Sequence, residues 1–367
     1  MKKFSPFLCT LTLLFASAFG NVSAEELRYV DASTLTVIGK PFPTREYPFR
    51  RIEDFDFQDK GLNGKATHST GLAVVFKTDS RTLEAKWLTN ASVLNNMNPI
   101  GSKGLDLYIK TPEGRWLYAG SGRPNLKGDC RHHRFTLVTN MAEGEKECLL
   151  YLPLYNRCDS LSLGIDSAAS IAPLPNPFRY KVLFGGSSIT HGASANRAGQ
   201  CYTGLLGLKY GVYAINYGFS GQFKLEKPLA EYASRVDADV FIFDAFSNPS
   251  AEEIHERFDA FMDILRAEHP SIPVILLQTE RREACNFDMK IRSLEVAKQQ
   301  AAREVVFRRQ QKDVNLYFID SKDFLTPDGM STVDGTHPTD VAFERTVDII
   351  WPLLRELLER KPDPKGK

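Results

Sequence analysis

The first half of the chain is built from short segments in which apolar and polar residues alternate. Turn signals such as GKATHSTG, TPEGR and AEGEK separate them, and helical periodicity is almost absent. Alternation with a period of two is typical of strands that bury one face, so the pattern predicts an antiparallel, jelly-roll-like β-sandwich over residues 25–172. The clearest candidate strands are GLAVVFKT (71–78), LEAKWL (83–88), LDLYIK (105–110), RFTLVT (134–139) and ECLLYLPL (147–154).

Three alternate prolines, Pro173, Pro175 and Pro177, follow this region. Proline lacks a backbone N–H and fixes φ, so it can continue neither a helix nor a central strand. We therefore predict an extended linker over residues 173–178 and a second domain over residues 179–362.

Strands and helices alternate in the second half. The strands are rich in β-branched residues and almost continuously apolar, which is typical of a parallel sheet covered by helices on both faces. Pro352 lies inside the last helical segment and should kink it or begin a second one. The predicted strands are Tyr180–Gly185, Tyr213–Phe219, Asp239–Phe246, Pro273–Thr279 and Val314–Asp320. The predicted helices are Ala251–His269, Met289–Gln311 and Val341–Arg360.

Length and charge narrow the picture further. The chain has 367 residues, more than one ordinary domain core accommodates, which supports the division into two domains. Its 46 Lys and Arg balance 45 Asp and Glu, and no block of basic residues stands out. A nucleic-acid partner is not expected, because binding a phosphate backbone needs clustered positive charge.

The N-terminus has the pattern of a secretory signal peptide. Two lysines precede an apolar run over residues 7–19, and VSA (22–24) offers small residues for cleavage, with cleavage after Ala18 as a weaker alternative. The run is shorter than the ~20 residues that a spanning helix needs, which argues against a retained anchor. We expect residues 1–24 to be removed and the mature protein to be soluble and exported, either periplasmic or secreted.

Five cysteines follow this segment. Because their number is odd, at least one stays unpaired even where the compartment oxidises thiols. A bridge among the first three and plain buried thiols both fit the sequence. The five are Cys130, Cys148, Cys158, Cys201 and Cys285.

Residues that could carry chemistry follow several of the predicted strands. In a parallel sheet the carboxyl ends of the strands share one edge, where ligands bind. A serine beside a histidine and a carboxylate can become a nucleophile, while a glycine N–H and an asparagine amide are suitable oxyanion donors. For the serines alone, a turn with Ser as a helix N-cap is the alternative. The candidates are Ser187, Ser188, His191, Gly218, Gly221, Asn248, Asp334 and His337.

Four motifs, taken together, resemble a known family. GGSSITHG is similar to the nucleophile block of the SGNH (GDSL-like) hydrolases, NYGFSG to their glycine block, FSNP to their asparagine block and DGTHP to their Asp-x-x-His block. The motifs occur in the family's order over residues 181–360. The resemblance implies a flavodoxin-like, three-layer α/β/α hydrolase domain. In it Ser188 is the nucleophile, His337 the base and Asp334 the carboxylate that orients the base.

The resemblance also implies an oxyanion hole and a reaction that needs neither a metal ion nor an organic cofactor. The oxyanion donors would be the Ser188 N–H, the Gly221 N–H and the Asn248 side chain. Two positions depart from the family's pattern. Ser187 and Pro249 stand where the family usually has aspartate.

The first half carries a resemblance of its own. GLDLYIK is similar to the Gly-x-Asp-Leu-Tyr signature of a β-sandwich domain that precedes the hydrolase domain in a subgroup of exported bacterial enzymes. THSTG and LPLYN are similar to other parts of that domain. Asp106 and Tyr108 of the signature have either a structural role in the sandwich or a role lining the active-site cleft.

Three further features have competing interpretations. His191 could act as the base, but no carboxylate stands at a spacing that would orient it, so we expect it to shape the pocket. The run CRHHR (130–134) could bind a metal, yet zinc sites need spaced pairs of ligands, so an exposed polar loop is expected. Residues 280–282 follow the fourth strand and would either contact an acidic or hydroxyl-rich substrate or remain solvated.

The sequence therefore indicates an exported serine esterase that hydrolyses short-chain O-acyl esters. O-acetyl groups on a small-molecule or polysaccharide carbohydrate are the expected substrates, by analogy with the family. Lipid or phospholipid acyl esters are the enzymatic alternative, although the long apolar lid that would favour them is not seen near the four motifs. An inactive secreted glycan-binding protein is the alternative of another class. The oligomeric state is left open.

Overall fold

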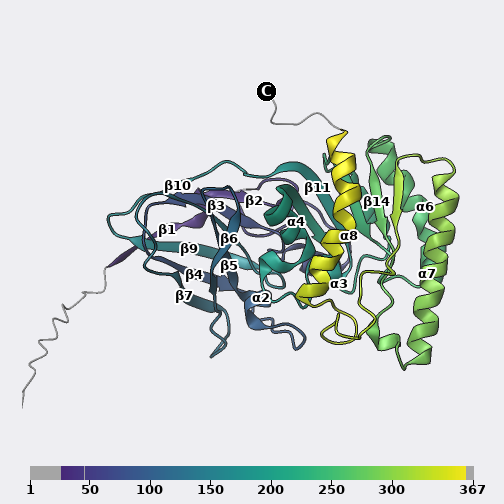
Figure 1. The fold of residues 1–367 in the computed structure, drawn as a ribbon, viewed down its shortest axis with the longest axis horizontal. Helices are drawn as coiled ribbons and strands as arrows, with labels where there is room; N and C mark the ends of the chain where they lie inside the picture. Colours follow the sequence, from purple (N-terminus) through teal and green to yellow (C-terminus); the bar gives the residue numbers. More distant parts are fainter. Residues whose placement is uncertain (1–25, 45, 361–367) are drawn as a thin grey trace, which may run out of the picture.

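The computed structural model describes residues 26–44 and 46–360, so the predicted signal peptide lies outside the described residues. Figure 1 shows a β-sandwich beside an α/β region. The sandwich has two sheets, with strand orders β1-β9-β4-β7 and β10-β3-β8-β5-β6, and β2 also pairs with β3. All of these pairs are antiparallel, which confirms the predicted sandwich. The strands are β1 (Leu27–Asp31), β2 (Thr36–Ile38), β3 (Ala73–Thr78), β4 (Leu83–Thr89), β5 (Leu105–Lys110), β6 (Trp116–Gly122), β7 (His132–Val138), β8 (Lys146–Tyr151), β9 (Cys158–Asp166) and β10 (Ile171–Pro173).

Two short helices interrupt the sandwich, α1 (Lys60–Ala66) and α2 (Pro99–Lys103), and a 3₁₀ turn, η1 (Ala32–Thr34), follows β1. Asp59 and Asn98 cap the two helices, each accepting a hydrogen bond of 2.8 Å from a backbone N–H of the first turn. Asp and Asn are preferred at this position because their side chains satisfy an otherwise unpaired N–H. Neither helix was predicted from the sequence.

The second half contains a parallel sheet with the strand order β12-β11-β13-β14-β15. This is the flavodoxin-like order, in which the first strand has a neighbour on each side and ligands bind at its carboxyl end. All of the strands predicted here are present, with ends shifted by a few residues. They are β11 (Arg179–Gly186), β12 (Val212–Gly218), β13 (Val240–Asp244), β14 (Val274–Leu277) and β15 (Leu316–Ile319).

Helices cover both faces of this sheet, with α4 and α8 on one face and α6 and α7 on the other (Figure 1). Within β11, Val182 and Phe184 pack with α4 and α8, whereas Leu183 packs with α5, α6 and α7. The last helix continues unbroken through Pro352, so no second segment begins there. The helical elements are α3 (Ser188–His191), η2 (Ala198–Gln200), α4 (Tyr202–Tyr210), α5 (Lys227–Ser234), α6 (Ala251–Glu268), η3 (Glu283–Cys285), α7 (Met289–Gln310) and α8 (Asp340–Glu359).

The two halves share hydrophobic cores. In β3, Val74 and Phe76 face the interior of the sandwich, while Ala73 and Val75 join the cluster that includes α4, α8 and one face of the parallel sheet. The sheet that contains β3 is therefore buried on both faces, and the sandwich uses its second face to pack against the α/β half. The sandwich also extends to Pro173, the first residue of the predicted linker, because β10 pairs with β3.

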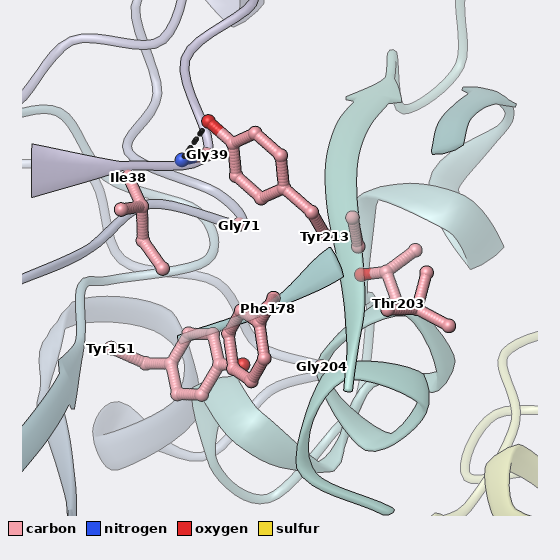
Figure 2. Close-up of a pocket in the computed structure, with 10 residues that line it drawn as sticks. Ile38, Gly39, Gly71, Tyr151, Phe178, Thr203, Gly204 and Tyr213 are labelled. Atoms are coloured by element: carbon pink, nitrogen blue, oxygen red, sulfur yellow. Dashed lines mark hydrogen bonds between the residues drawn. The ribbon is translucent and has the colours of Figure 1, made fainter. Parts of the chain in front are cut away.

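Figure 2 shows the junction between the halves on one side of this contact. The Gly39 N–H donates a hydrogen bond of 3.3 Å to the Tyr213 hydroxyl. Ile38 and Gly71 from the sandwich half lie opposite Thr203 and Tyr213 from the α/β half, around a narrow cavity of about 10 Å³. A space of this size holds at most about one water molecule, so the junction is closely packed.

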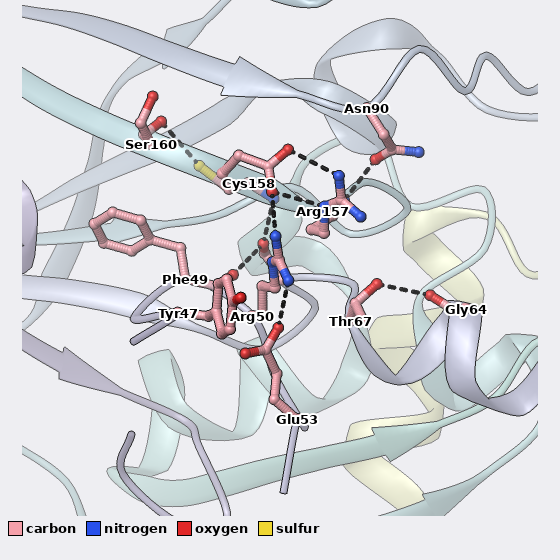
Figure 3. Close-up of polar contacts among 12 residues, drawn as sticks. Tyr47, Phe49, Arg50, Glu53, Gly64, Thr67, Asn90, Arg157, Cys158 and Ser160 are labelled. Atoms are coloured by element: carbon pink, nitrogen blue, oxygen red, sulfur yellow. Dashed lines mark hydrogen bonds and ion pairs between the residues drawn. The ribbon is translucent and has the colours of Figure 1, made fainter. Parts of the chain in front are cut away.

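A segment before α1 fastens the halves together on another side. Arg50 forms ion pairs with Glu53 at 2.8 Å and with Asp159 of β9 at 3.1 Å, in the region of Figure 3. Its neighbour Arg51 instead points into the α/β half, where its side chain reaches backbone carbonyls of β12. The segment therefore connects β9 of the sandwich to β12, the strand next to β11.

Candidate active site

Ser188 begins the short helix α3 (Ser188–His191) directly after β11. Ser187 caps the helix, since its side chain accepts a hydrogen bond of 3.1 Å from a first-turn N–H. The helix rests on β12, where a Cβ at Gly218 would lie 2.3 Å from the His191 backbone nitrogen. Only glycine permits that approach, so Gly218 allows the turn with Ser188 to pack against the neighbouring strand.

Ser188, His337 and Asp334 form a continuous line of hydrogen bonds. His337 Nε2 lies 2.9 Å from Ser188 Oγ, and His337 Nδ1 lies 2.7 Å from Asp334 Oδ2. In the tautomer that fits both contacts, Nδ1–H donates to the carboxylate and Nε2 accepts the serine hydroxyl proton. The loops after the first and last strands therefore converge as predicted, and the imidazole is in position to take a proton from the serine.

The Asp334 carboxylate accepts several further hydrogen bonds. Its Oδ1 accepts from the backbone N–H groups of Thr336 at 3.0 Å and His337 at 2.9 Å, and its Oδ2 accepts from Asn96 Nδ2 at 3.0 Å. Partial burial opposes ionisation. The hydrogen bonds from Asn96 and His337 outweigh it and hold the pKa of Asp334 well below its ordinary value. Asp334 is therefore ionised at neutral pH and can orient the imidazole.

Gly221 and Asn248 lie close to each other beside this centre. The Asn248 amide donates a hydrogen bond to the carbonyl of Gln222, the residue after Gly221. Gly221 has a φ of 67°, in the left-handed region that favours glycine. Because β11 pairs with both β12 and β13, the loops that carry these two residues flank the turn with Ser188. One N–H of the Asn248 amide remains available for another acceptor. Their role as oxyanion donors stays a prediction.

Comparisons with known proteins agree with this geometry. Residues 179–355 match the GDSL-like lipase/acylhydrolase family, and residues 27–171 match the N-terminal region of SGNH-hydrolase-type esterases known as GxDLY. A crystal structure from Bacteroides ovatus ATCC 8483, assigned to the GDSL-like lipases, is 40% identical with a TM-score of 0.86, over 91% of this chain and 98% of that one. The chain belongs to the GDSL-like lipase/acylhydrolase family. This confirms the resemblance and supports ester hydrolysis as its class of reaction.

More distant structures share the fold of this GDSL-like protein. The salicylyl-acyltransferase SsfX3 from a tetracycline biosynthetic pathway is 18% identical, with a TM-score of 0.69 over 90% of this chain and 97% of that one. A family two carbohydrate esterase from Cellvibrio japonicus is 14% identical, with a TM-score of 0.58 over 91% of this chain and 98% of that one. A comparison with curated proteins gave no match.

Asp244 accounts for the unusual serine before the nucleophile in this GDSL-like protein. It ends β13, is buried, and accepts hydrogen bonds from the Ser187 N–H at 3.2 Å and from the Ser187 hydroxyl. Its second oxygen accepts from Ser247, the residue before Asn248, at 2.5 Å. A carboxyl group from a neighbouring strand thus contacts the residue before Ser188, and it ties the turn that carries Ser188 to the asparagine motif. The sequence analysis missed Asp244, although an acid at the end of the apolar strand VFIFD is a usable signal.

Glu280 lies beside Asp244 and is only 5% exposed, so it neither contacts a substrate at the surface nor remains solvated as the sequence analysis considered. Its Oε2 has no hydrogen-bond partner among the described residues. Burial, together with the charge of Asp244, raises the pKa of Glu280 to about 8. Glu280 is therefore held in its neutral form inside the protein at neutral pH.

We expect Glu280→Gln to stabilise the protein, and to do so more at high pH. The folded pKa is raised above the unfolded value, so the stability that the neutral acid contributes is present at about pH 4 and is lost as the pH rises toward 8. Glutamine cannot ionise, so its advantage should grow to roughly 1–3 kcal/mol at pH 8.5. Urea unfolding of both proteins at pH 5 and pH 8.5 measures this, and an equal difference at the two pH values would contradict it.

His191 attaches the nucleophile helix to the sandwich. It is fully buried, and its Nε2 lies 3.1 Å from the Leu154 carbonyl and 3.1 Å from His68 Nδ1. Burial lowers the pKa of both imidazoles, that of His68 to about 3. The Tyr155 ring lies 4.3 Å from the His191 ring, and its hydroxyl donates to the Ser188 carbonyl at 3.3 Å. His191 therefore contacts the sandwich behind the turn that carries Ser188, while His337 contacts the serine hydroxyl.

The Gly-x-Asp-Leu-Tyr signature also forms a contact between the halves. Asp106 Oδ2 accepts hydrogen bonds from the Tyr108 hydroxyl at 2.9 Å and from the Gly199 N–H at 3.0 Å, and Arg197 lies 3.6 Å from its other oxygen. Burial raises the pKa of Asp106 to about 6. Asp106 and Tyr108 thus have the structural role that was considered. Their contacts hold the loop after α3, which belongs to the other half, as well as the sandwich.

The structure also locates the cysteines and the CRHHR run. The five cysteines within the described residues carry free thiols, and each except Cys130 is buried. The run CRHHR was expected to form an exposed loop. It does not do so along its whole length, because His133 is buried in β7 and bonds to Thr89 at 2.9 Å. In the described part of the chain, no cluster of three His, Cys, Asp or Glu side chains could hold a metal ion. Among the described helices, none is both long and apolar enough to span a bilayer.

Proposed function

We propose that this protein is an exported serine esterase that hydrolyses short-chain O-acyl esters, with O-acetyl groups on carbohydrate as its preferred substrates. The observation that carries the proposal is the line of contacts from Ser188 Oγ through His337 to Asp334, at 2.9 and 2.7 Å. These distances are those of hydrogen bonds that can transfer a proton, and the family membership supports ester hydrolysis independently.

The proposed reaction proceeds in two halves. Ser188 Oγ attacks the ester carbonyl carbon while His337 Nε2 takes its proton, and the resulting oxyanion accepts hydrogen bonds from Ser188 N–H, Gly221 N–H and the Asn248 amide. The tetrahedral intermediate collapses, the C–O bond to the alcohol breaks, and the proton on His337 passes to the leaving oxygen. Water, deprotonated by His337, then attacks the acyl-enzyme and releases the acid and free Ser188.

Two features favour a hydroxyl-rich alcohol. The pair Asp334 and His337 retains 31% and 18% of its side-chain exposure, so the centre is open to solvent. Amide side chains lie nearby, among them Asn98 and Asn196, whose side chains bond to each other at 2.9 Å. Amides both donate and accept hydrogen bonds, which suits sugar hydroxyl groups. The fold shared with a family two carbohydrate esterase is consistent with this choice.

One observation favours the alternative of lipid or phospholipid acyl esters. Phe287 is 96% exposed and Met330 is 75% exposed. They lie on two segments that are joined by the bond from the Ala284 N–H to the Gly335 carbonyl at 2.9 Å, next to Asp334. Where such side chains form one contiguous patch, they provide a surface to which an amphiphilic substrate can bind. A preference for long acyl chains would therefore support this alternative.

Hydrolysis of p-nitrophenyl acetate, butyrate and octanoate, beside acetate release from acetylated xylan, distinguishes the two substrate classes. We expect kcat/KM to be highest for acetate and to fall by roughly tenfold or more at octanoate, because a short acyl pocket excludes extra methylenes. The variant Phe287→Ser tests separately whether this exposed apolar side chain contributes to binding of a long acyl chain. A preference for octanoate that this variant abolishes would overturn the carbohydrate proposal.

Export is also part of the proposal, and it rests on the pattern of residues 1–24. Expression of the full chain in a Gram-negative host should give a periplasmic protein that begins at Glu25. N-terminal sequencing of the cell fractions measures this, and an uncleaved cytoplasmic protein would contradict it.

A further inference from the structure

The loop between β4 and α2 extends from the sandwich to the candidate active site. At its tip, the Asn96 side chain donates a hydrogen bond of 3.0 Å to Asp334 Oδ2. The same nitrogen lies 3.4 Å from His337 Nδ1. Since 238 residues separate Asn96 from Asp334, this contact exists only because the two halves are packed together.

Hydrogen-bond chemistry determines which of these contacts is an attraction. The amide nitrogen of asparagine and the Nδ1–H of His337 are both donors, so their approach at 3.4 Å is not a hydrogen bond between them. Both instead donate to the same oxygen, Asp334 Oδ2, at 3.0 and 2.7 Å. With the two backbone N–H groups on Oδ1, they fix the plane of the carboxylate, and the imidazole keeps Nε2 toward Ser188.

The loop around Asn96 is held in place on the hydrolase side. The Ser194 hydroxyl donates to the Asn96 carbonyl at 2.8 Å, and the Asn98 amide donates to the Asn196 side chain at 2.9 Å. Asn196 in turn donates from its backbone and side chain to Asp340, at 2.9 and 2.7 Å. Asp340 begins α8 and lies three residues after His337. The loop that carries Asn96 is therefore bonded to the same segment that carries His337.

The loop is also held on the sandwich side, by a buried cation. Lys103 has no exposed surface, and its ammonium group donates to the carbonyls of Asn90 at 2.6 Å and Ser92 at 2.9 Å and to the Asn156 side chain at 3.0 Å. Three charge-assisted bonds at the base of a loop restrict its motion. Asn156 belongs to the LPLYN motif, so this gives that motif a structural purpose.

We infer that Asn96 of the sandwich is a positioning residue for the Asp334–His337 pair, so that the β domain completes the active site. The inference rests on the proposed function, because it assigns Asn96 to the base of that reaction. Asn96 holds the carboxylate in the orientation that receives the imidazole N–H, and it contacts neither the substrate nor Ser188.

Three variants test the inference, with p-nitrophenyl acetate as the substrate. Asn96→Ala should lower kcat by about tenfold, as expected for the loss of one hydrogen bond to a charged group, with KM changed by less than about twofold. Asn95→Ala is the matched control, because Asn95 is exposed and adjacent, and it should keep wild-type kcat. A merely structural loop residue would change KM or thermal stability rather than kcat alone.

Asn96→Asp gives a second readout, because its kcat relative to that of wild type is compared at two pH values at which both proteins are folded. The ionised aspartate would repel Asp334, whereas the protonated acid donates a hydrogen bond as the amide does. The titratable groups facing position 96 are Asp334 and His337, whereas Asp340 is linked to the same loop through Asn196 and Asn98. The ratio of variant to wild-type kcat should therefore be about 0.01 at pH 8 and rise about tenfold at pH 5.5.

The outcomes separate this inference from the proposed function. A wild-type protein without esterase activity would overturn the proposed function, and the role of Asn96 with it. An active wild type whose kcat is matched by Asn96→Ala, or a ratio for Asn96→Asp that does not change with pH, would overturn the role of Asn96 alone.

Discussion

Replacing Ser188 by alanine should lower kcat for p-nitrophenyl acetate by about 10⁴-fold or more while the protein remains folded. The Ser188 hydroxyl oxygen lies 2.9 Å from His337 Nε2, and no other hydroxyl is bonded to that nitrogen among the described residues. Without it, neither acyl transfer to the protein nor proton transfer to the imidazole can begin. Residual hydrolysis would come from water attack at the oxyanion site, since nucleophile and base act as a unit.

Two controls make this prediction specific. The double variant Ser188→Ala/His337→Ala should be no slower than Ser188→Ala, because the second change removes a group that has already lost its partner. Ser187→Ala should keep kcat within about tenfold of wild type but lose about 1 kcal/mol of stability, because Ser187 is a helix cap bonded to Asp244. Equal activity of Ser188→Ala and wild type would contradict the nucleophile assignment and end the serine esterase proposal.

The line of catalytic candidates could be predicted from the sequence for a topological reason. Strands in a parallel sheet deliver their carboxyl ends to one edge, so the ends of buried strands in the sequence identify residues that meet in space. Ser188 follows β11 and is bonded to His337, which follows β15 by a longer loop. The periodicity located those strand ends to within a few residues, and the resemblance to the SGNH hydrolases implied which of the candidates act together.

Residues that reach the site from outside that edge could not be predicted in this way. Asn96 lies in a polar loop of the sandwich, and nothing in NASVLNNMNP distinguishes it from its neighbours Asn95 and Asn98. Its contact with Asp334 depends on the docking of one half against the other, which no local pattern encodes. Asp244 was accessible in principle, because a charged residue at the end of an apolar strand needs partners when buried.

The same distinction applies to the fold. The strand AVVFKT was predicted to bury one face, yet Ala73 and Val75 pack against the hydrolase half, so both of its faces are buried. Its nearly continuous apolar run agrees with this better than alternation does. The strand β9 was not predicted, although Leu161, Leu163 and Ile165 alternate and are buried. Pro352 was expected to kink the last helix or to begin a second segment, and the helix continues through it without a second segment.

These observations describe two halves that work as one unit. The sandwich contributes Asn96 to the catalytic line, His68 to the support of the nucleophile helix, and Asp106 to the loop that follows it. Each contact is made by a polar group whose partner lies in the other half, and two of the three groups are buried or nearly so. Buried polar contacts of this kind are costly to break, so the relative position of the halves is fixed together with the site.

Arg51 also connects the two halves. It is 1% exposed and donates hydrogen bonds to the Asn216 carbonyl at 3.0 Å, the Gly218 carbonyl at 3.0 Å and the Lys65 carbonyl at 2.9 Å. No carboxylate neutralises it in these bonds, and burial lowers its pKa to about 10. Its guanidinium therefore remains charged at neutral pH and is stabilised by carbonyl dipoles at the end of β12, next to the turn that leads to Gly221.

We therefore expect Arg51→Met to lower the free energy of unfolding by about 3 kcal/mol or more, because three hydrogen bonds from a buried, charged donor would be lost, two of them to carbonyls of β12. Arg50→Met is the matched control: Arg50 is partly exposed, its ion pairs are with Glu53 and Asp159, and its loss should cost no more than about 1 kcal/mol. Urea unfolding followed by circular dichroism measures both. Because the lost bonds hold the end of β12, Arg51→Met should also lower kcat at temperatures where it is folded, whereas Arg50→Met should not. Equal stabilities of the two variants would show that Arg51 does not join the halves.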